Sequence, residues 1–582
     1  MESLIRGLGV QPTLQNFQMK KFDINRLLKD LACVTEYTGN QGAKRIGVRV
    51  GVIGTESATA ATFKDKNGRA VKISQYIKDV HKTQLTNNMC PIVIDSRTKM
   101  AFAPECLLVA PNQRVKTDQA QSGVIDSLIK ESAILPSERK KQTAAMKDNL
   151  QLKAPEMASF GVKTAAEPLT VKARVLPPVN LLGGNMSKFV SNAGKIPDHA
   201  VVKAVDLNNW WLVCTNQGDN VDLRALGSNL VLAAKKKGAK FANPHIDSVF
   251  IDQRFDDGFD DLLQKAKSAG AQLVMVVSER RVKNHDKLKA AEQRVGIVTE
   301  QILSQNAQKA SQAGGSAQTL ENIVRKMIEK TGGQDVAVNP GGDVPAWLFG
   351  QDCMILSFAQ PAYGETIGQL LKDVITKYRA IRGKPPLKII LFVGGVAEGD
   401  FDKMINEEMK VIRGGFDKLS TSFNPTLVVI SANLSHSDRF YRANMANLPK
   451  GRNMAQIENL PSGTVIDRGV TNPLRNEMFI QSHVPLQGTA KVPQYVKLLD
   501  MKGAMNNDQM QAMLFALTHV HGICNLTTAI PTPVYVASEC LKRAKAQLAN
   551  FERSGGQWSV ETLNKEVAIG PEHTLAFTRF NA

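Results

Sequence analysis

Residues 271–303 read AQLVMVVSERRVKNHDKLKAAEQRVGIVTEQIL. The apolar run at 273–277 has the length of a buried strand, and a polar turn leads from it into a helical segment that carries His285 and Lys289. These two residues are four positions apart and therefore lie on one face of the helix. Gln301 ends a β-branched run that predicts another strand. The stretch thus predicts a strand, a helix and a strand, the unit from which parallel sheets are built.

A second helix is predicted in residues 318–333, QTLENIVRKMIEKTGG, where Lys326 and Lys330 lie one turn apart. Like charges at this spacing repel each other by about 0.2–0.5 kcal/mol on an isolated helix, so an anion such as phosphate between them would be stabilising. A solvated helix face is the alternative, and the lysine pair taken alone favours it. The anion site is favoured because the lysine pair follows His285, Lys289 and Gln301 of the first stretch in one combined pattern.

The composition indicates a globular protein with an anionic partner. The chain has 582 residues, which predicts three or four domains, and 43% of them are hydrophobic. Its 73 Lys and Arg outnumber 54 Asp and Glu, and the formal net charge of +19 favours binding to nucleic acid or to an acidic membrane surface. The seven cysteines show no CxxC or Cys/His ligand spacing, so we expect neither a disulfide framework nor a zinc site. We also expect no cofactor. The sequence has no signal-like segment and no apolar run of membrane-spanning length, which predicts a cytoplasmic or nuclear protein.

The two stretches resemble the MID domain of Argonaute proteins. In that family a Tyr, a Lys, a Gln and two further Lys at these spacings hold the 5′-phosphate of a guide RNA. Lys289, Gln301, Lys326 and Lys330 match this pattern, and His285 stands in place of the usual Tyr. A histidine here resembles the worm-specific nematode clade, whose guides often bear a 5′-triphosphate. The resemblance therefore implies that these five residues bind the 5′ end of a guide RNA.

The resemblance covers nearly all of the chain after residue 20 and implies a multidomain α/β fold. Nothing before residue 20 resembles the family's N-terminal domain, so we expect an N-terminally truncated member, either a fragment or a protein that lost this lobe. The expected parts are an N-terminal extension at 1–19, a small β-barrel-like PAZ domain at 20–116, a linker at 117–205, a Rossmann-like MID domain at 206–340 and an RNase H-like PIWI domain at 341–582.

Within residues 20–116, the segment ISQYIKDVHKTQL resembles a PAZ piece that lines the pocket for the guide 3′ end. Tyr76 and His81 match it, and both rings can stack on a terminal nucleotide. Packing of these rings at the edge of a small barrel explains them equally well. The region between Val50 and Phe63 lacks the aromatic residues that the family usually has there.

In the PIWI-like part, the resemblance implies a degenerate cleavage site. Slicing members of the family hold two Mg²⁺ ions with Asp, Glu, Asp and His. Here Asp352 and Glu365 can supply the first two ligands, whereas Gly394 and Ser538 stand where the second Asp and the His are expected. Only thirteen residues separate Asp352 from Glu365, far fewer than in the family, so some strands are expected to be missing. Arg543 matches an arginine that reaches the guide 5′-phosphate.

The sequence therefore predicts an Argonaute that binds a single-stranded guide RNA, pairs it with target RNA and recruits silencing proteins, without membrane association and without slicing. Two alternatives stay open: a residual metal-dependent endoribonuclease that uses Asp352 and Glu365, and a truncated scaffold that carries no guide.

Overall fold

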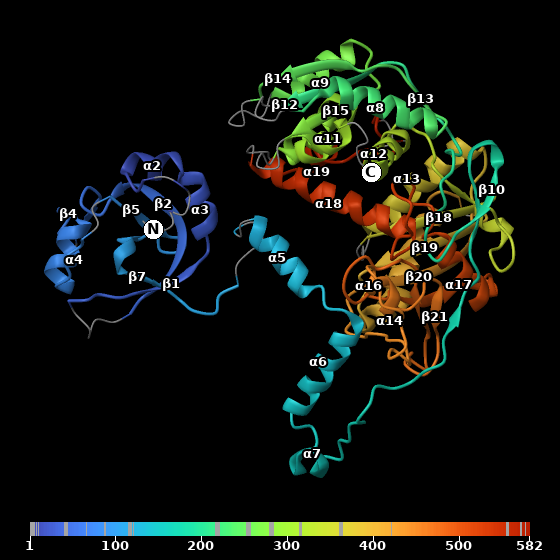
Figure 1. Ribbon diagram of the computed structural model, residues 1–582, viewed down its shortest axis with the longest axis horizontal. Helices are drawn as coiled ribbons and strands as arrows, with labels where there is room; N and C mark the ends of the chain where they lie inside the picture. Colours follow the sequence, from blue (N-terminus) through green and yellow to red (C-terminus); the bar gives the residue numbers. More distant parts are fainter. Residues whose placement is uncertain are drawn as a thin grey trace. The chain divides into compact units, whose positions relative to one another are not determined.

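The computed structural model divides the chain into two compact units, Met1–Ala133 and Ile134–Ala582, which are described separately (Figure 1). It describes all residues except 1–5, 7, 8, 10, 40–44, 66, 87, 88, 115–118, 120, 121, 216–220, 252–257, 279–283, 313–316, 360–364, 421, 554–557, 571, 572, 577 and 582.

The Met1–Ala133 unit is built on a five-stranded antiparallel sheet with the strand order β6-β5-β2-β1-β7. The strands are β1 (Ala32–Thr35), β2 (Gly47–Ser57), β5 (Pro91–Asp95), β6 (Ala101–Phe102) and β7 (Leu107–Val109). A hairpin of β3 (Thr62–Lys64) and β4 (Ala70–Lys72) leads into α4 (Ile73–His81). The other helices are α2 (Leu14–Met19), α3 (Lys21–Leu28) and α5 (Ser122–Ser132).

The Ile134–Ala582 unit contains a parallel four-stranded sheet with the order β14-β12-β15-β16. Its strands are β12 (Trp210–Thr215), β14 (His245–Val249), β15 (Leu273–Ser278) and β16 (Val298–Leu303). Every residue of β15 is buried, as expected for a parallel strand that is covered on both faces. The covering helices are α8 (Leu223–Lys236), α9 (Gly258–Ser268), α10 (His285–Val295), α11 (Ser304–Ser311) and α12 (Ala317–Lys330).

A seven-stranded mixed sheet forms the second core of this unit, in the order β18-β19-β20-β23-β22-β21-β8. Its strands are β8 (Arg174–Val175), β18 (Cys353–Phe358), β19 (Lys388–Gly394), β20 (Thr426–Asn433), β21 (Thr464–Ile466), β22 (Asn476–Gln481) and β23 (Gln494–Asp500). The helices around it are α13 (Glu365–Arg382), α14 (Phe401–Lys403), α15 (Met409–Asp417), α16 (Met454–Glu458), α17 (Asn507–Ala516) and α18 (Thr532–Arg553). Helix α19 (Val560–Glu566) lies instead beside α10, where Gln293 Nε2 donates to the Glu566 carbonyl at 3.2 Å.

Helix α18 joins the two cores. It contacts α10 beside the four-stranded sheet and also β18 and β19 of the seven-stranded sheet, and Figure 1 shows it (red) between the two layers. None of the helices in the described part of the chain is long and apolar enough to cross a membrane.

The segment expected as a linker, 117–205, contributes to several elements. Besides helices α6 (Pro136–Asn149) and α7 (Pro155–Ser159), it supplies β8, which pairs with β21. It also supplies β9 (Asn180–Leu182) and β10 (Lys188–Val190), which form a small antiparallel sheet with β17 (Ala337–Val338). Directly after this segment, the short strand β11 (Asp206–Leu207) pairs in parallel with β13 (Lys240–Phe241).

Candidate functional site

One cavity of about 360 Å³ in the Ile134–Ala582 unit brings together six side chains that the sequence singled out. We call it the lysine cavity. The six residues come from α10, β16, α12 and α18 and are His285, Lys289, Gln301, Lys326, Lys330 and Arg543. Its lining also includes Asp286, Glu300, Glu539, Lys542, Ala546, Phe580 and Asn581.

Helix α10 and strand β16 place His285 next to Gln301. The helix ends because Gly296 adopts φ 74°, a left-handed conformation that favours glycine, and a Cβ there would lie 2.4 Å from Thr574 Oγ1. The chain then reverses into β16, which brings Gln301 Oε1 to 2.7 Å from His285 Nδ1. Gln301 Nε2 in turn donates to Asn284 Oδ1 at 2.7 Å, so its orientation is fixed.

Lys289 is buried and fully engaged by protein acceptors. Its Nζ lies 2.8 Å from Glu292 Oε2, 3.0 Å from the Thr299 carbonyl oxygen and 2.9 Å from Thr299 Oγ1. An ammonium has three N–H donors, and these three acceptors occupy them. A phosphate at this lysine therefore has to compete with Glu292 or Thr299, or interact by charge alone.

Lys326 and Lys330 share one carboxylate, and only one of the two lysines is accessible. Lys330 Nζ is buried, donates to the Thr299 carbonyl at 2.9 Å and lies 2.6 Å from Glu300 Oε2. Lys326 Nζ is 3.7 Å from Glu300 Oε1, and 37% of its side chain is exposed. Lys326 is therefore the lysine of this pair that solvent or a ligand reaches most easily.

Arg543 is held from several sides. Its Nη1 lies 3.2 Å from Glu292 Oε2 and donates to the Phe580 carbonyl at 3.1 Å. The Phe580 ring lies 4.5 Å from the guanidinium carbon, within the range of a cation–π interaction. The other carboxylate oxygen of Glu292 accepts from the Thr299 backbone N–H at 3.0 Å. Glu292 thereby ties together α10, β16 and α18.

Burial and neighbouring charges set the protonation states of the cavity. Burial lowers the pKa of Lys289 to about 7, although Glu292 opposes this shift. Burial alone would raise the pKa of Glu292 and of Glu300, but the adjacent cations hold both pKa values below the ordinary range. The pKa of His285 is lowered, chiefly by burial. Both glutamates are therefore carboxylates at neutral pH, and His285 is a neutral imidazole.

Sequence reasoning missed Glu300 and Phe580 of the lining, and it also missed Glu292 and Thr299, which accept hydrogen bonds from the lining residue Lys289. Two signals were present in the sequence. Glu292 follows Lys289 by three positions, which is salt-bridge spacing on a helix, and Glu300 interrupts a β-branched strand, where a buried carboxylate needs cationic partners. The contact of Phe580 with Arg543 depends on the folded path of the C-terminal segment, which no local pattern encodes.

In the Met1–Ala133 unit, the predicted residues Tyr76 and His81 belong to a cluster of four aromatic rings. Tyr37 stacks on His81 with ring centroids 3.7 Å apart and nearly parallel planes. Tyr76 meets His81 edge-on at 5.6 Å, and Phe63 meets Tyr76 edge-on at 5.3 Å. Phe63 and Tyr76 are each more than one third exposed. Sequence reasoning missed Tyr37, which comes from the loop after β1.

The structure does not bring Asp352 to Gly394. Asp352 directly precedes β18, next to the start of β19, and its Oδ1 lies 2.7 Å from Lys384 Nζ. Gly394 lies at the opposite end of β19, about 20 Å away for six extended residues. Glu365 begins α13, but its side chain lies outside the described part of the structure. Asp352 therefore cannot share one metal site with a group at position 394.

A cavity of about 410 Å³ occupies the Gly394 end of β19 and β20, and we call it the Glu398 cavity. Its lining includes Glu398, Asn433, His436, Asp438, Asn472, Arg475, Glu477 and Gln494. Glu398 accepts from Asn472 Nδ2 at 2.8 Å, and Glu477 accepts from Gln494 and from the Asn472 backbone. Across the described residues, no three His, Cys, Asp or Glu side chains gather in a way that could hold a metal ion.

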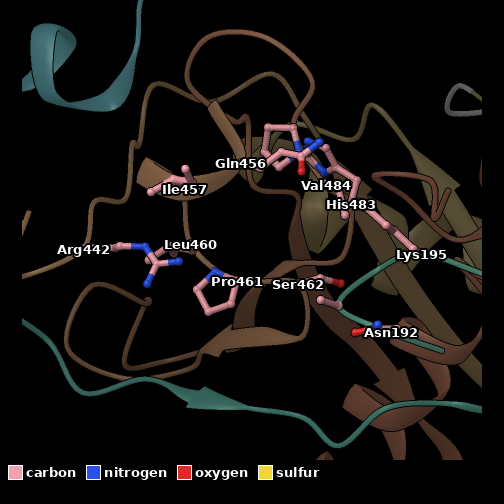
Figure 2. A pocket seen from close by; sticks show the side chains of 12 residues that line it. Asn192, Lys195, Arg442, Gln456, Ile457, Leu460, Pro461, Ser462, His483 and Val484 are labelled. Carbon is pink, nitrogen blue, oxygen red and sulfur yellow. The ribbon is translucent and has the colours of Figure 1, made fainter. Parts of the chain in front are cut away.

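A third cavity, of about 320 Å³, lies between the segment after β10 and the loops around β21 and β22, and we call it the Arg442 cavity (Figure 2). Lys195, Arg442 and His483 line it together with apolar residues such as Ile457 and Leu460. Arg442 is oriented by its Nε, which donates to the Asn459 carbonyl at 2.8 Å. Its described lining contains no carboxylate, so the cavity is basic.

Comparisons with known proteins agree with this architecture. The Piwi domain family matches residues 349–549. Argonaute protein wago-1 of Caenorhabditis elegans is 28% identical over 94% of this chain and 61% of its own length. Argonaute protein wago-4 of the same organism is 24% identical over 93% of this chain and 62% of its own length. The chain therefore spans about three fifths of the length of these relatives.

Solved structures share the fold at low sequence identity. A crystal structure of Drosophila Piwi matches 98% of this chain and 76% of that chain, with a TM-score of 0.62 and 15% identity. A crystal structure of Kluyveromyces polysporus Argonaute with a guide RNA matches 97% of this chain and 68% of that chain, with a TM-score of 0.66 and 19% identity. The predicted multidomain α/β fold with an RNase H-like Piwi domain is confirmed.

Proposed function

Because this chain belongs to the Argonaute family, we propose that it anchors the 5′-phosphate of a small guide RNA in the lysine cavity and presents the guide for pairing with target RNA. The observation that carries this proposal is the convergence of Lys289, Lys326, Lys330 and Arg543 on one cavity. Each charge-assisted contact to a phosphate contributes about 1.5–3 kcal/mol, so a few such contacts suffice for tight binding.

The side chains of the cavity have different roles in binding the guide. Lys326, which is partly exposed, and Arg543, which is oriented by Phe580, are the best placed to contact phosphate oxygens directly. Lys330 is deeper and contributes mainly through its charge, whereas Lys289, with a pKa of about 7, is charged only in part at neutral pH. His285, neutral and fixed by Gln301, offers an imidazole face on which the first base can stack.

Other regions of the chain fit the remainder of a bound RNA. The basic Arg442 cavity can contact the phosphodiester backbone, which lends affinity without reading sequence. In the Met1–Ala133 unit, the cluster of Tyr37, Phe63, Tyr76 and His81 offers exposed rings to the 3′-terminal nucleotide. Sequence specificity then comes from the guide, and silencing is carried out by recruited proteins.

We further propose that silencing proceeds without target cleavage by this chain. An RNase H-like site needs oxygen ligands that hold two Mg²⁺ ions about 4 Å apart. Support comes from the separation of Asp352 and Gly394 at opposite ends of the paired strands and from the hydrogen bonds that already engage Glu398 and Glu477. Incubation of the guide-loaded protein with a matched, labelled target and Mg²⁺ is expected to leave the target intact, and a single cut opposite the guide would refute this part of the proposal.

The test of guide binding uses Lys326→Gln, because Lys326 is accessible and its loss leaves no deeply buried charge without a close partner. The protein is purified from cells that express it, and its RNA is extracted and sequenced with and without 5′-polyphosphatase treatment. We expect short RNAs of defined length in the wild type and several-fold fewer in Lys326→Gln. Lys236→Gln is the matched control, an exposed lysine on α8 outside the cavity.

If all three proteins carry the same small amount of background RNA, the guide-binding proposal fails. The guide-free scaffold then becomes the better explanation of the chain.

A further inference from the structure

Strand β18 lies at the edge of the seven-stranded sheet, and β19 is the strand that pairs with it in the described part of the chain. The Asp352 carbonyl accepts from the Lys388 N–H at 2.9 Å, so Asp352 faces β19 and the residues after it alternate between the two sides. The backbone groups of Ile355 and Ser357 therefore point away from β19. Among the described residues, none forms a hydrogen bond with these groups, and the Ser357 hydroxyl is buried without a hydrogen-bond partner. The outer side of β18 is thus open to pairing with a further strand.

The packing of helix α13 shows which of its sides lies above this edge. Gly368 faces α15, because a Cβ on Gly415 of α15 would lie 3.0 Å from the Gly368 Cα. Tyr378 lies about 80° away around the helix. Its hydroxyl donates to the Cys353 carbonyl at 3.2 Å, on the outer side of β18. The side of α13 that lies beyond Tyr378 therefore overlooks the space beside this outer side.

Three exposed apolar residues form a stripe on this side of α13. Leu370, Val374 and Ile381 lie about 40–80° further around the helix than Tyr378. Their exposed fractions are 42%, 37% and 63%. A strand added to β18 would lie about 4.8 Å farther out, and its side chains would remove the stripe from water. The apolar stripe and the open edge thus face the same space.

The segment around this edge is basic. Residues 351–388 contain six Lys and Arg but only three Asp and Glu. The exposed cations include Arg379, Arg382 and Lys384, and Lys384 pairs with Asp352 at 2.7 Å. A second copy of this chain would bring the same excess of positive charge to the edge and would be repelled. An acidic partner is attracted instead.

We propose that the outer side of β18 and the apolar stripe of α13 form a docking surface for an extended, acidic and β-branched segment of a partner protein. The segment adds a strand to the sheet. Its backbone pairs with Ile355 and Ser357, and its alternate side chains pack on the stripe. The surface shares no residue with the lining of the lysine cavity, so its use does not depend on guide binding. It offers a silencing protein a place to dock on this chain.

The probe is a fluorescein-labelled peptide of sequence DEVTVTVTVDE, which alternates β-branched residues between acidic ends. Fluorescence anisotropy measures its affinity for the full chain, and hydrogen exchange measures the protection of single amides. We expect the peptide to slow exchange of the Ile355 and Ser357 amides at least about tenfold. The same peptide with lysine ends should bind more weakly, and the difference should shrink as salt is added.

N-methylation of the peptide backbone tests strand addition directly. One peptide is methylated on its valine nitrogens and another on its threonine nitrogens. Alternate residues of a strand point their N–H groups to opposite sides, so only one of the two sets can face β18. We expect one methylated peptide to lose at least about tenfold in affinity and the other to bind like the parent.

Variants of the protein test the two parts of the surface. Leu370→Ser/Val374→Ser changes two exposed positions and is expected to weaken binding of the peptide about tenfold. Leu232→Ser is the matched control, at a leucine of α8 that is 59% exposed, and should leave the affinity unchanged. Ile355→Pro removes an outward N–H that β19 does not use and should also weaken binding.

Several outcomes would overturn the proposal. One is unchanged exchange at Ile355 and Ser357 with about 1 mM peptide. Equal binding of both methylated peptides would exclude strand addition, and equal binding by Leu370→Ser/Val374→Ser and the wild type would exclude the stripe. If a single-stranded RNA protected the two amides and the peptide did not, the surface would bind RNA. If the chain formed dimers that Leu370→Ser/Val374→Ser abolished, the occupant would be a second copy.

Discussion

The lysine cavity and the Glu398 cavity lie in the same unit and have similar volumes, about 360 and 410 Å³, but their polar groups are arranged in opposite ways. In the lysine cavity, five Lys and Arg side chains and three Asp and Glu side chains form the lining, so basic groups are in excess. In the Glu398 cavity, the carboxylates accept hydrogen bonds from neutral amides such as Asn472 and Gln494. The first arrangement is suited to an anionic ligand. The second holds Glu398 and Glu477 in hydrogen bonds with amides and gathers no metal ligands among the described residues.

The largest expected effect distinguishes the two lysines of α12. Lys330→Ala leaves the buried Glu300 without its close partner and is expected to lower the free energy of unfolding by about 3–5 kcal/mol. Lys326→Ala removes an exposed partner at 3.7 Å and should cost about 0–1 kcal/mol. Urea denaturation of both variants measures the difference. If both variants lost the same free energy of unfolding, burial would not determine how much each ion pair contributes to stability.

Acid is expected to lower the free energy of unfolding because the core around the seven-stranded sheet contains buried histidines. Burial lowers the pKa of His519 to about 4, so the folded state keeps this ring neutral while the unfolded state takes up a proton below about pH 6.5. Stability is therefore lost as the pH falls from about 6.5 toward 4, by about 2 kcal/mol at pH 5. Glu292 and Glu300 have pKa values below the ordinary range, so we expect them to contribute little to the loss of stability between pH 7 and pH 5.

The measurement is urea denaturation at pH 7 and pH 5. Between pH 7 and pH 5, the free energy of unfolding of His519→Gln is expected to fall by about 2 kcal/mol less than that of the wild type. His245→Gln, at an exposed histidine of β14, serves as the control and should lose as much as the wild type. If the free energy of unfolding fell as much in His519→Gln as in the wild type, groups other than His519 would cause the acid sensitivity.

A carboxylate restored at position 394 tests whether the Glu398 cavity can regain a cleavage site. A Cβ on Gly394 would lie 2.7 Å from the Ala359 carbonyl oxygen, so Gly394→Asp is expected to destabilise the protein by about 1–3 kcal/mol and to produce no Mg²⁺-dependent cleavage. Gly399→Asp is the matched control, since a Cβ there meets no atom within 4 Å. Target cleavage by Gly394→Asp would remove the contrast between the two cavities.

The smallest expected effect concerns the aromatic support of Arg543. Phe580→Leu keeps an apolar side chain but loses the cation–π contact, which contributes about 0.5–1 kcal/mol. Affinity for 5′-phosphorylated RNA should therefore fall about two- to fivefold, while affinity for 5′-hydroxyl RNA stays the same. Phe580→Tyr should restore binding. A loss that is equal for both RNA ends would indicate general damage to the fold.

The sequence allowed much of the lysine cavity to be predicted because its residues sit at fixed helical and strand spacings. Lys289 follows His285, and Lys330 follows Lys326, by one turn, and such periodic positions survive large sequence change. Glu300 was missed because its role depends on two lysines of another element. Asp352 shows the same limit, because a short motif does not reveal at which end of a sheet its residue will lie. The strand pairing of β18 with β19 decides that point, and this pairing is a long-range property.

The participation of Phe580 and Asn581 in the lysine cavity has a consequence for protein synthesis. His285 to Lys330 leave the ribosome well before Arg543, and Phe580 and Asn581 follow Arg543 by a further 37 and 38 residues. During translation the nascent chain therefore carries the lysines and their carboxylates without the arginine and its aromatic support. A ligand that requires the complete cavity can therefore bind only after residue 581 has left the ribosome.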